Sequence, residues 1–192
     1  MNLQKIESYY KVRPETGLID AGAYIPSPNC DSRPNGQAPE LIVVHNISLP
    51  PNQFGGSQIT QLFTNCLNPE EDPFFREIEG LRVSAHLLIR RDGSMIQYVP
   101  FNQRAWHAGL SCYKERSACN DFSIGIELEG SDHTSFTMSQ YLSLSEVIKA
   151  LWLVYPSLSE HNVVGHSDIA PGRKTDPGPY FMWASLNRLL ES

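Results

Sequence analysis

The chain has 192 residues and a formal net charge of −6, with 15 lysine and arginine residues against 21 aspartate and glutamate residues. Hydrophobic residues make up 41% of the sequence and charged residues 19%, a globular composition that excludes an intrinsically disordered chain. The acidic balance and the lack of a Lys/Arg cluster argue against nucleic acid as a partner. The length suits one domain with a sizeable core, so we expect residues 1–192 to form a single domain.

Two features of the sequence concern the compartment. No apolar stretch approaches the roughly 20 residues that a membrane-spanning helix needs, so we expect no membrane partner. Residues 1–13 are polar and lack the apolar core of a secretory signal, which predicts a cytoplasmic protein. No two of the cysteines have the C-x-x-C spacing of a zinc or redox site, and in a cytoplasmic protein we expect them to be reduced thiols. The cysteines are Cys30, Cys66, Cys112 and Cys119.

The sequence begins with a segment rich in proline. Residues 14–40 contain five prolines separated by polar residues and glycine, which indicates an extended segment wrapped on the domain. We therefore assign 1–40 to an N-terminal wrap and about 41–190 to the catalytic core. Within the core, residues 41–44 are the first predicted strand, and a loop rich in Pro and Gly follows at 49–56.

The middle of the chain predicts one short helix and a pair of strands. Residues 57–65 have the apolar spacing of a helix, whereas 68–80 are acidic and contain proline, which is typical of a surface excursion. Strands are predicted at 83–89 and 95–99, and the Asp-Gly pair between them is typical of a β-hairpin. A loop at 100–109 then carries a cation, an indole and an imidazole.

The last third of the chain alternates strands and helices. Residues 124–128 are a predicted strand, and Thr137 and Gln140 have the spacing of a capping box that opens a long helix. A final strand at 163–165 precedes a proline-rich loop, and Pro179 is expected to open the last helix. Strands interleaved with helices predict an α/β fold of the α+β type, a single domain with a central mixed β-sheet flanked by helices.

Three of the apolar stretches each contain or lead into one reactive polar residue, namely His45, Glu127 and His166. A loop stiffened by three prolines follows His166 and carries Lys174 and Asp176. If the three strands share one sheet, these side chains meet at one edge of it. Two histidines and one carboxylate are a common ligand set for a catalytic zinc that keeps an open position for water.

Each of these residues also has a plainer interpretation. A histidine after an apolar strand is often structural, so His45 or His166 alone does not require a metal. Asp176 lies in an Asp-Pro-Gly-Pro sequence that suits a turn, and Lys174 suits a solvated surface charge. Glu127 fits an edge carboxylate, although burial in an apolar run is costly for it unless it is paired. The residues by themselves therefore leave a zinc site and a purely structural set open.

Six motifs, in order along the chain, resemble the AmpD family of zinc amidases, the cytoplasmic 1,6-anhydro-N-acetylmuramoyl-L-alanine amidases of Gram-negative bacteria. The resemblance covers roughly residues 20–190. The motifs lie at residues 43–51 with 54–56, 83–86, 89–93, 104–109, 120–127 and 173–179. In the wider fold group of phage amidases and peptidoglycan-recognition proteins the third ligand is typically cysteine. In this sequence the position of the third ligand looks like Asp176 instead of a cysteine, which favours the AmpD branch and an active enzyme.

The resemblance implies a fold, a cofactor and a reaction. The implied fold is the mixed sheet flanked by helices of amidases and peptidoglycan-recognition proteins, and the implied Zn²⁺ ligands are His45, His166 and Asp176. Glu127 is implied to be the general acid and base, and Lys174 to stabilise the oxyanion. The implied reaction, part of peptidoglycan recycling, is hydrolysis of the amide between (1,6-anhydro)-N-acetylmuramic acid and L-alanine of the stem peptide.

We expect five further residues to contact an anhydromuropeptide substrate, namely Asn46, Arg82, Trp106, His107 and Arg173. Guanidinium groups suit peptide carboxylates, and the indole and imidazole suit a sugar or first-residue pocket. Each also has a plainer interpretation as a surface charge or a loop anchor. We expect the protein to act as a monomer.

Two other functions share this fold. A non-catalytic muropeptide-binding module is expected to lack a metal ligand or Glu127, and both are present in this sequence. A periplasmic amidase acting on intact murein needs an export signal, and residues 1–13 do not resemble one. A purely structural zinc normally has a fourth protein ligand that closes the site.

Overall fold

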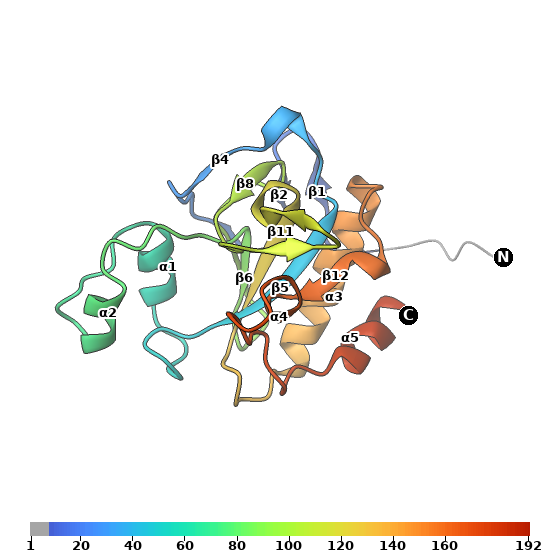
Figure 1. Ribbon diagram of the computed structural model, residues 1–192. Coiled ribbons are helices and arrows are strands. Elements are labelled where there is room, and N and C mark those ends of the chain that lie inside the picture. The colour runs from blue at the N-terminus through green and yellow to red at the C-terminus, as the bar shows by residue number, and fades with distance from the viewer. Residues whose placement is uncertain (1–7) are drawn as a thin grey trace.

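The computed structural model describes residues 8–192 and is built on a six-stranded mixed β-sheet (Figure 1). Its strands lie in the order β12 (Val163–Gly165), β5 (Leu41–Ile47), β11 (Ser123–Glu129), β6 (Leu87–Ile89), β7 (Met95–Gln97) and β3 (Ala23–Tyr24). The first four of these strands run parallel, whereas β7 is antiparallel to β6 and parallel to β3. The expected mixed sheet is confirmed.

Helices cover both faces of the sheet. α3 (Met138–Val154) and α5 (Trp183–Leu190) lie together at one side of the molecule, and α1 (Gln58–Phe63) and α2 (Pro73–Glu77) lie at the opposite side (Figure 1). The core beneath α3 and α5 takes in alternate residues of two central strands. These residues are Ile42 and Val44 of β5 and Ile124, Ile126 and Leu128 of β11. The described residues form a single domain with helices on both sides of a mixed sheet, as predicted.

The alternation along β5 and β11 decides which side chains reach the other face. Because successive residues of a strand point to opposite faces, His45 and Glu127 project from the face that α3 does not cover. The two residues are also register partners in the parallel pairing of β5 with β11. The sheet thus brings two of the predicted site residues together without any help from a loop.

Smaller elements complete the fold. Three two-stranded ladders pair β1 (Val12–Arg13) with β2 (Leu18–Ile19), β4 (Cys30–Ser32) with β8 (Gln103–Ala105), and β9 (Cys112–Tyr113) with β10 (Arg116–Ser117). The short helices are η1 (Pro34–Gly36), η2 (Cys119–Asp121), η3 (Glu160–Asn162) and α4 (His166–Ile169). The expected N-terminal wrap therefore also contributes strands β3 and β4. Residues 1–7 lie outside the described residues. They include part of the predicted wrap (1–40) and part of the segment 1–13 that was predicted to lack a secretory signal.

Two segments differ in detail from the sequence-based expectation. The excursion 68–80 contains α2, because the Asp72 side chain caps the helix by accepting from the Phe74 N–H at 2.8 Å. The strand predicted at 83–89 is shorter and begins only at Leu87. Local capping explains the first difference, since Asp72-Pro73 is a helix-start signal that was overlooked.

The last helix begins at Trp183, so the prediction that Pro179 opens it was wrong. The backbone first makes a turn in which the Phe181 N–H donates to the Gly178 carbonyl at 3.1 Å. The capping box of Thr137 and Gln140 at the start of α3 is confirmed. Across residues 8–192 no helix is both long and apolar enough to cross a membrane, and the four cysteines are free.

A buried arginine ties the N-terminal segment to the start of β11. Arg33 is only 4% exposed, and burial lowers its pKa to about 10, so it remains charged at neutral pH. Its guanidinium donates to four backbone carbonyls at 2.8–3.3 Å. The acceptors belong to Phe101, Asn120, Asp121 and Ser123. This side chain therefore links the N-terminal segment to Phe101 and to residues 120–123.

Candidate active site

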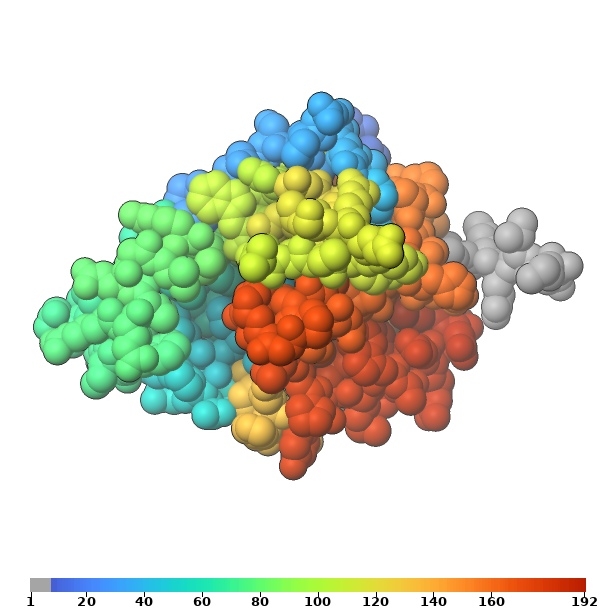
Figure 2. All heavy atoms as spheres, viewed as in Figure 1, coloured from blue at the N-terminus to red at the C-terminus, as the bar shows by residue number. Residues whose placement is uncertain are grey.

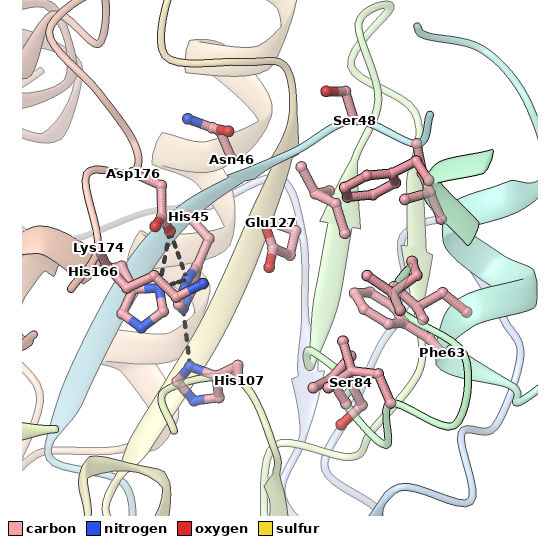
Figure 3. A pocket seen from close by; sticks show the side chains of 17 residues that line it. His45, Asn46, Ser48, Phe63, Ser84, His107, Glu127, His166, Lys174 and Asp176 are labelled. Atoms are coloured by element: carbon pink, nitrogen blue, oxygen red, sulfur yellow. Dashed lines mark hydrogen bonds and ion pairs between the residues drawn. The ribbon is translucent and has the colours of Figure 1, made fainter. Parts of the chain in front are cut away.

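A cavity of about 390 Å³ opens beside the carboxyl ends of β5, β11 and β12. Figure 2 shows this face of the molecule, hollowed between the green segment around α2 and the orange segment around α4. The lining includes all five residues predicted for metal binding and catalysis (Figure 3). They are His45, Glu127, His166, Lys174 and Asp176. The structure thus brings the sequence-predicted cluster together in one cavity.

Three of these side chains converge on one point. His45 Nδ1, His166 Nδ1 and Asp176 Oδ2 lie 3.0 Å from one another (Figure 3). His45 comes from β5 and His166 is the first residue of α4, whereas Asp176 lies on the following loop. That loop is tied to α4, because the Ser167 N–H donates to the Asp176 carbonyl oxygen at 2.9 Å. The two histidines are 1% and 3% exposed.

The hydrogen bonds of His166 test whether this cluster fits a metal ion. Its Nε2 faces the carbonyl oxygen of Ala108 at 3.1 Å, and because a carbonyl only accepts, Nε2 must carry the proton. In the neutral ring Nδ1 then bears a lone pair, which points at the Asp176 carboxylate. Two facing lone pairs repel unless a cation lies between them. Two imidazoles and one carboxylate also match a catalytic zinc site with an open position, so the residues fit zinc.

The protonation state of His45 suits the same role. Burial lowers its pKa to about 4, although the neighbouring Asp176 carboxylate acts in the opposite direction. The ring is therefore neutral at pH 7, which a metal ligand requires. Its other nitrogen, Nε2, lies 2.9 Å from Nδ1 of His107.

Glu127 provides a buried carboxylate beside the three converging atoms. Glu127 is 9% exposed, and its Oε2 has no hydrogen-bond partner among residues 8–192. Burial, and then the charge of Asp176, raises the pKa of Glu127 well above its usual value. A buried acceptor without a partner that lines a cavity is available to a proton from a bound molecule. This is the arrangement expected of a general base.

Lys174 lies on the loop after α4 and brings a positive charge to the cavity. Its backbone N–H donates to the Ala170 carbonyl oxygen at 3.0 Å, which fixes the start of the loop on the end of α4. The charge of Lys174 opposes part of the pKa rise at Glu127. A cation so placed can stabilise negative charge that develops on a bound carbonyl.

The five predicted substrate contacts are divided by the structure. Asn46 and His107 line the cavity, whereas Arg82, Trp106 and Arg173 are not among its lining residues. The side-chain amide of Asn46 donates to Asp132 Oδ1 at 2.7 Å and to the Pro177 carbonyl at 3.1 Å, so it holds the loop of Asp176. Arg82 lines an adjacent hollow. Substrate contacts by these residues remain predictions.

His107 and Arg173 are both occupied by partners within the protein. Arg173 Nη2 donates to the carbonyl oxygens of Ala108 and Leu110 at 2.7 and 2.6 Å. The ring nitrogens of His107 meet His45 Nε2 at 2.9 Å and Ser123 Oγ at 3.1 Å. Burial, and then the neighbouring His45, lowers the pKa of His107 well below its usual value. The polar atoms of this ring are therefore committed to the protein.

Sequence reasoning missed the apolar wall of the cavity. This wall extends from β5 toward α1 and α2 and includes Leu49, Leu62, Phe63, Phe74, Ile78, Leu81 and Val83. The apolar spacing of α1 marked Leu62 and Phe63 as inward-facing, but spacing alone does not tell a core position from a cavity wall. Cavities that combine an apolar wall with a few convergent polar groups are typical binding sites for small molecules.

Comparisons with known proteins identify similar molecules. The family model of N-acetylmuramoyl-L-alanine amidases matches residues 35–179. The chain is 56% identical over 176 residues to the 1,6-anhydro-N-acetylmuramyl-L-alanine amidase AmpD of Escherichia coli (strain K12), an alignment spanning 92% of this chain and 96% of the relative. A crystal structure of a selenomethionine derivative of AmpD matches with a TM-score of 0.89 and 54% identity, over 91% of this chain and 97% of that chain. AmpDh3 from Pseudomonas aeruginosa in complex with anhydromuramic pentapeptide matches with a TM-score of 0.62 and 30% identity, over 81% of this chain and 61% of that chain.

Proposed function

Because the chain belongs to the N-acetylmuramoyl-L-alanine amidase family, we propose that it hydrolyses the amide between 1,6-anhydro-N-acetylmuramic acid and L-alanine in muropeptides, with zinc held by His45, His166 and Asp176. The amidase activity is that of the family. The anhydro form of the substrate is supported by the relative from Escherichia coli, whose name states it and whose length is matched over 96%. The reaction belongs to peptidoglycan recycling.

The observation that carries the proposal is the convergence of His45 Nδ1, His166 Nδ1 and Asp176 Oδ2 beside a buried carboxylate that has no partner of its own. When bound there, zinc supplies a Lewis acid that acidifies water and polarises a carbonyl oxygen. His45, His166 and Asp176 would hold the ion, and three protein ligands of this kind are typical of catalytic zinc sites.

Glu127 moves the proton in this mechanism. Its unpartnered Oε2 accepts the proton of the water that attacks the amide carbonyl, and it then donates this proton to the leaving amine of L-alanine. The raised pKa favours the second half of the cycle, because the protonated carboxyl is the form that donates to the leaving amine. The sheet fixes the carboxylate next to His45, so its position requires no loop movement.

Lys174 stabilises the transition state from the loop side of the cavity. Its ammonium group faces the space between the ligands and Glu127, where negative charge develops on the carbonyl oxygen (Figure 3). The apolar wall that includes Leu62 and Phe63 is proposed to exclude water from the bound substrate.

The remaining parts of the proposal concern recognition and setting. Asn46, Arg82, Trp106, His107 and Arg173 are assigned to the substrate-binding region, and the two arginines are assigned to stem-peptide carboxylates beyond the cavity. We propose that residues 1–192 act as one amidase domain, as a monomer in the cytoplasm, with the anhydromuropeptide as the small-molecule partner. No role for nucleic acid or membrane is proposed.

A joint measurement of metal content and product tests this function. The purified protein is analysed for zinc per chain and incubated with an anhydromuropeptide, and the products are separated by mass spectrometry before and after treatment with a chelator. We expect one zinc per chain and release of free stem peptide, lost with the chelator and restored by zinc. Zinc without cleavage would favour the non-catalytic binding module, and cleavage by fully zinc-free protein would refute the proposed mechanism.

A further inference from the structure

The two histidines of the proposed metal site share a support at their second ring nitrogens, the ones that do not face Asp176. His45 Nε2 lies 2.9 Å from Nδ1 of His107, and His166 Nε2 lies 3.1 Å from the carbonyl oxygen of Ala108. Two consecutive residues of one loop therefore meet the second nitrogen of both rings. His107 uses its side chain for this contact, whereas Ala108 uses its backbone.

A chain of hydrogen bonds runs from His45 through His107 and Ser123 to the carbonyl oxygen of Cys119. This carbonyl sets the direction of every bond in the chain. Ser123 Oγ lies 2.6 Å from the carbonyl oxygen of Cys119, which can only accept, so the hydroxyl hydrogen points there. Ser123 Oγ must then accept from His107 Nε2 at 3.1 Å. In the neutral ring of His107, Nδ1 is left without a proton and accepts from His45 Nε2. The proton of His45 is thus placed on Nε2, and its Nδ1 keeps the lone pair that faces the metal site.

The carbonyl of Ala108 has the same effect on His166, because it requires a proton on Nε2 and leaves Nδ1 free. The loop itself is held at two points. Asn120 Oδ1 accepts from the backbone N–H groups of His107 and Ala108 at 3.1 and 2.8 Å, and Arg173 donates to the Ala108 carbonyl at 2.7 Å. These hydrogen bonds fix the backbone that carries the His107 ring and the Ala108 carbonyl, the two groups that meet the ligand histidines.

The sheet leaves room for this arrangement at Gly125 of β11. A Cβ atom at this position would overlap the ring of His107. Ser123 and Gly125 point to the same face of β11 as Glu127, so one strand carries the serine that orients the ring, the space for the ring and the proposed base.

We propose that His107 and Ser123 are positioning residues that hold the proton of His45 on Nε2, so that the site presents two ready lone pairs to zinc. The inference rests on the metal site of the proposed function. A ligand histidine whose second nitrogen is held in this way keeps its ring orientation and binds metal more tightly, and loss of such a partner typically weakens binding about 10–100-fold. In this role His107 acts on the metal through His45.

Zinc affinity is the first test. Ser123→Ala and His107→Ala are compared with wild type by competition against a chromophoric chelator, which measures the dissociation constant without any turnover. We expect both variants to bind zinc about 10–100-fold more weakly. Ser145→Ala is the matched control, because Ser145 is 2% exposed but lies on α3 and donates to the Leu142 carbonyl at 2.9 Å. Wild-type affinity in both Ser123→Ala and His107→Ala would overturn the proposal.

The second test measures which ring nitrogen of His45 and of His107 carries the proton. A general loss of packing could weaken zinc binding, but it would not by itself move this proton from one nitrogen to the other. Nuclear magnetic resonance of protein with isotope-labelled histidine rings locates the proton on each nitrogen. We expect His45 and His107 to carry theirs on Nε2 in wild type and Ser123→Ala to lose this pattern. A proton on Nδ1 of His45 in wild type would overturn the proposal. This outcome is read from wild-type protein, so it does not depend on whether His107→Ala folds. Failure of wild type to bind zinc would instead overturn the proposed function, and the tautomers would still be read in the zinc-free protein.

Discussion

His45 on β5 and Glu127 on β11 are register partners on adjacent parallel strands, and both side chains reach the same cavity. Neighbouring strands lie about 4.8 Å apart, so the pairing of the backbone sets the separation between the proposed ligand and the proposed base. Sites built on strands hold their geometry more closely than sites built on loops. Asp176 and Lys174 depend instead on the loop after α4 and on the hydrogen bonds that hold it there.

Replacement of Glu127 by glutamine separates proton transfer from metal binding. Glu127→Gln keeps the shape of the side chain but removes the base, so we expect kcat to fall about 10²–10⁴-fold while zinc content stays at the wild-type level. Steady-state kinetics together with metal analysis measure both effects. Wild-type kcat in this variant would remove Glu127 from the mechanism.

Glu129 provides the matched control on the same strand and the same face. It is 1% exposed, but its carboxylate accepts from the backbone N–H groups of Gly55 and Arg91 at 2.6 and 3.2 Å. Glu129→Gln should therefore act mainly on stability, since charge-assisted bonds of this kind contribute about 1.5–3 kcal/mol. An equal loss of kcat in both variants would show that the effect at Glu127 is not specific.

Removal of the Lys174 charge should affect the transition state more than binding. We expect Lys174→Ala to lower kcat about 10²–10³-fold with a smaller change in KM, because the ammonium group is proposed to act on charge that develops during the reaction. Asp176→Ala is the contrasting variant, since it removes a ligand and should lose zinc. If Lys174→Ala also lost its zinc, the lysine would have to be assigned to the metal site instead.

Much of the site could be predicted because strands impose a simple rule on sequence. The apolar runs that lead to His45 and His166 end at the same edge of a parallel sheet, so the two residues meet, as expected if their strands share one sheet. The partners of His107 could not be predicted in this way. Ser123 is an ordinary polar residue at the start of a strand, and its bond to His107 depends on how a distant loop folds over the sheet. The start of the last helix at Trp183 was missed for a similar reason, because a turn between Gly178 and Phe181 delays it.

The buried guanidinium of Arg33 should contribute strongly to stability. Arg33→Met keeps much of the apolar volume but leaves four backbone carbonyls without their donor. Each buried group left unsatisfied costs about 1–3 kcal/mol, so we expect the free energy of unfolding to fall by at least about 3 kcal/mol. Denaturant unfolding of zinc-free protein measures the change.

Arg76 is the matched control for Arg33, because it forms an ion pair on the surface with Glu70. The exposed fraction is 62% for the Arg76 side chain and 70% for the Glu70 side chain. Arg76→Met should change stability by less than about 1 kcal/mol. Similar losses in the two variants would show that the carbonyl cluster around Arg33 contributes little.

His86 should make stability depend on pH in a predictable direction. The residue is fully buried, and burial, followed by the charge of Arg33, lowers its pKa from 6.5 to about 3. Its Nδ1 accepts from the Gly125 N–H at 3.0 Å, a bond that protonation would destroy. Between pH 6.5 and about 3 the unfolded chain therefore binds a proton that the folded chain does not.

The contribution of neutral His86 is consequently complete above pH 6.5 and declines as the pH falls toward 3. His86→Asn, which cannot titrate, should lose less stability over this range than wild type. The gap between the two proteins should shrink by up to about 1.4 kcal/mol for each pH unit, because one pKa unit corresponds to that energy. Urea unfolding of both proteins with excess chelator removes the effect of metal loss at low pH. A gap that stays constant from pH 7 to about 4 would mean that His86 accepts a proton as readily in the folded chain as in the unfolded one.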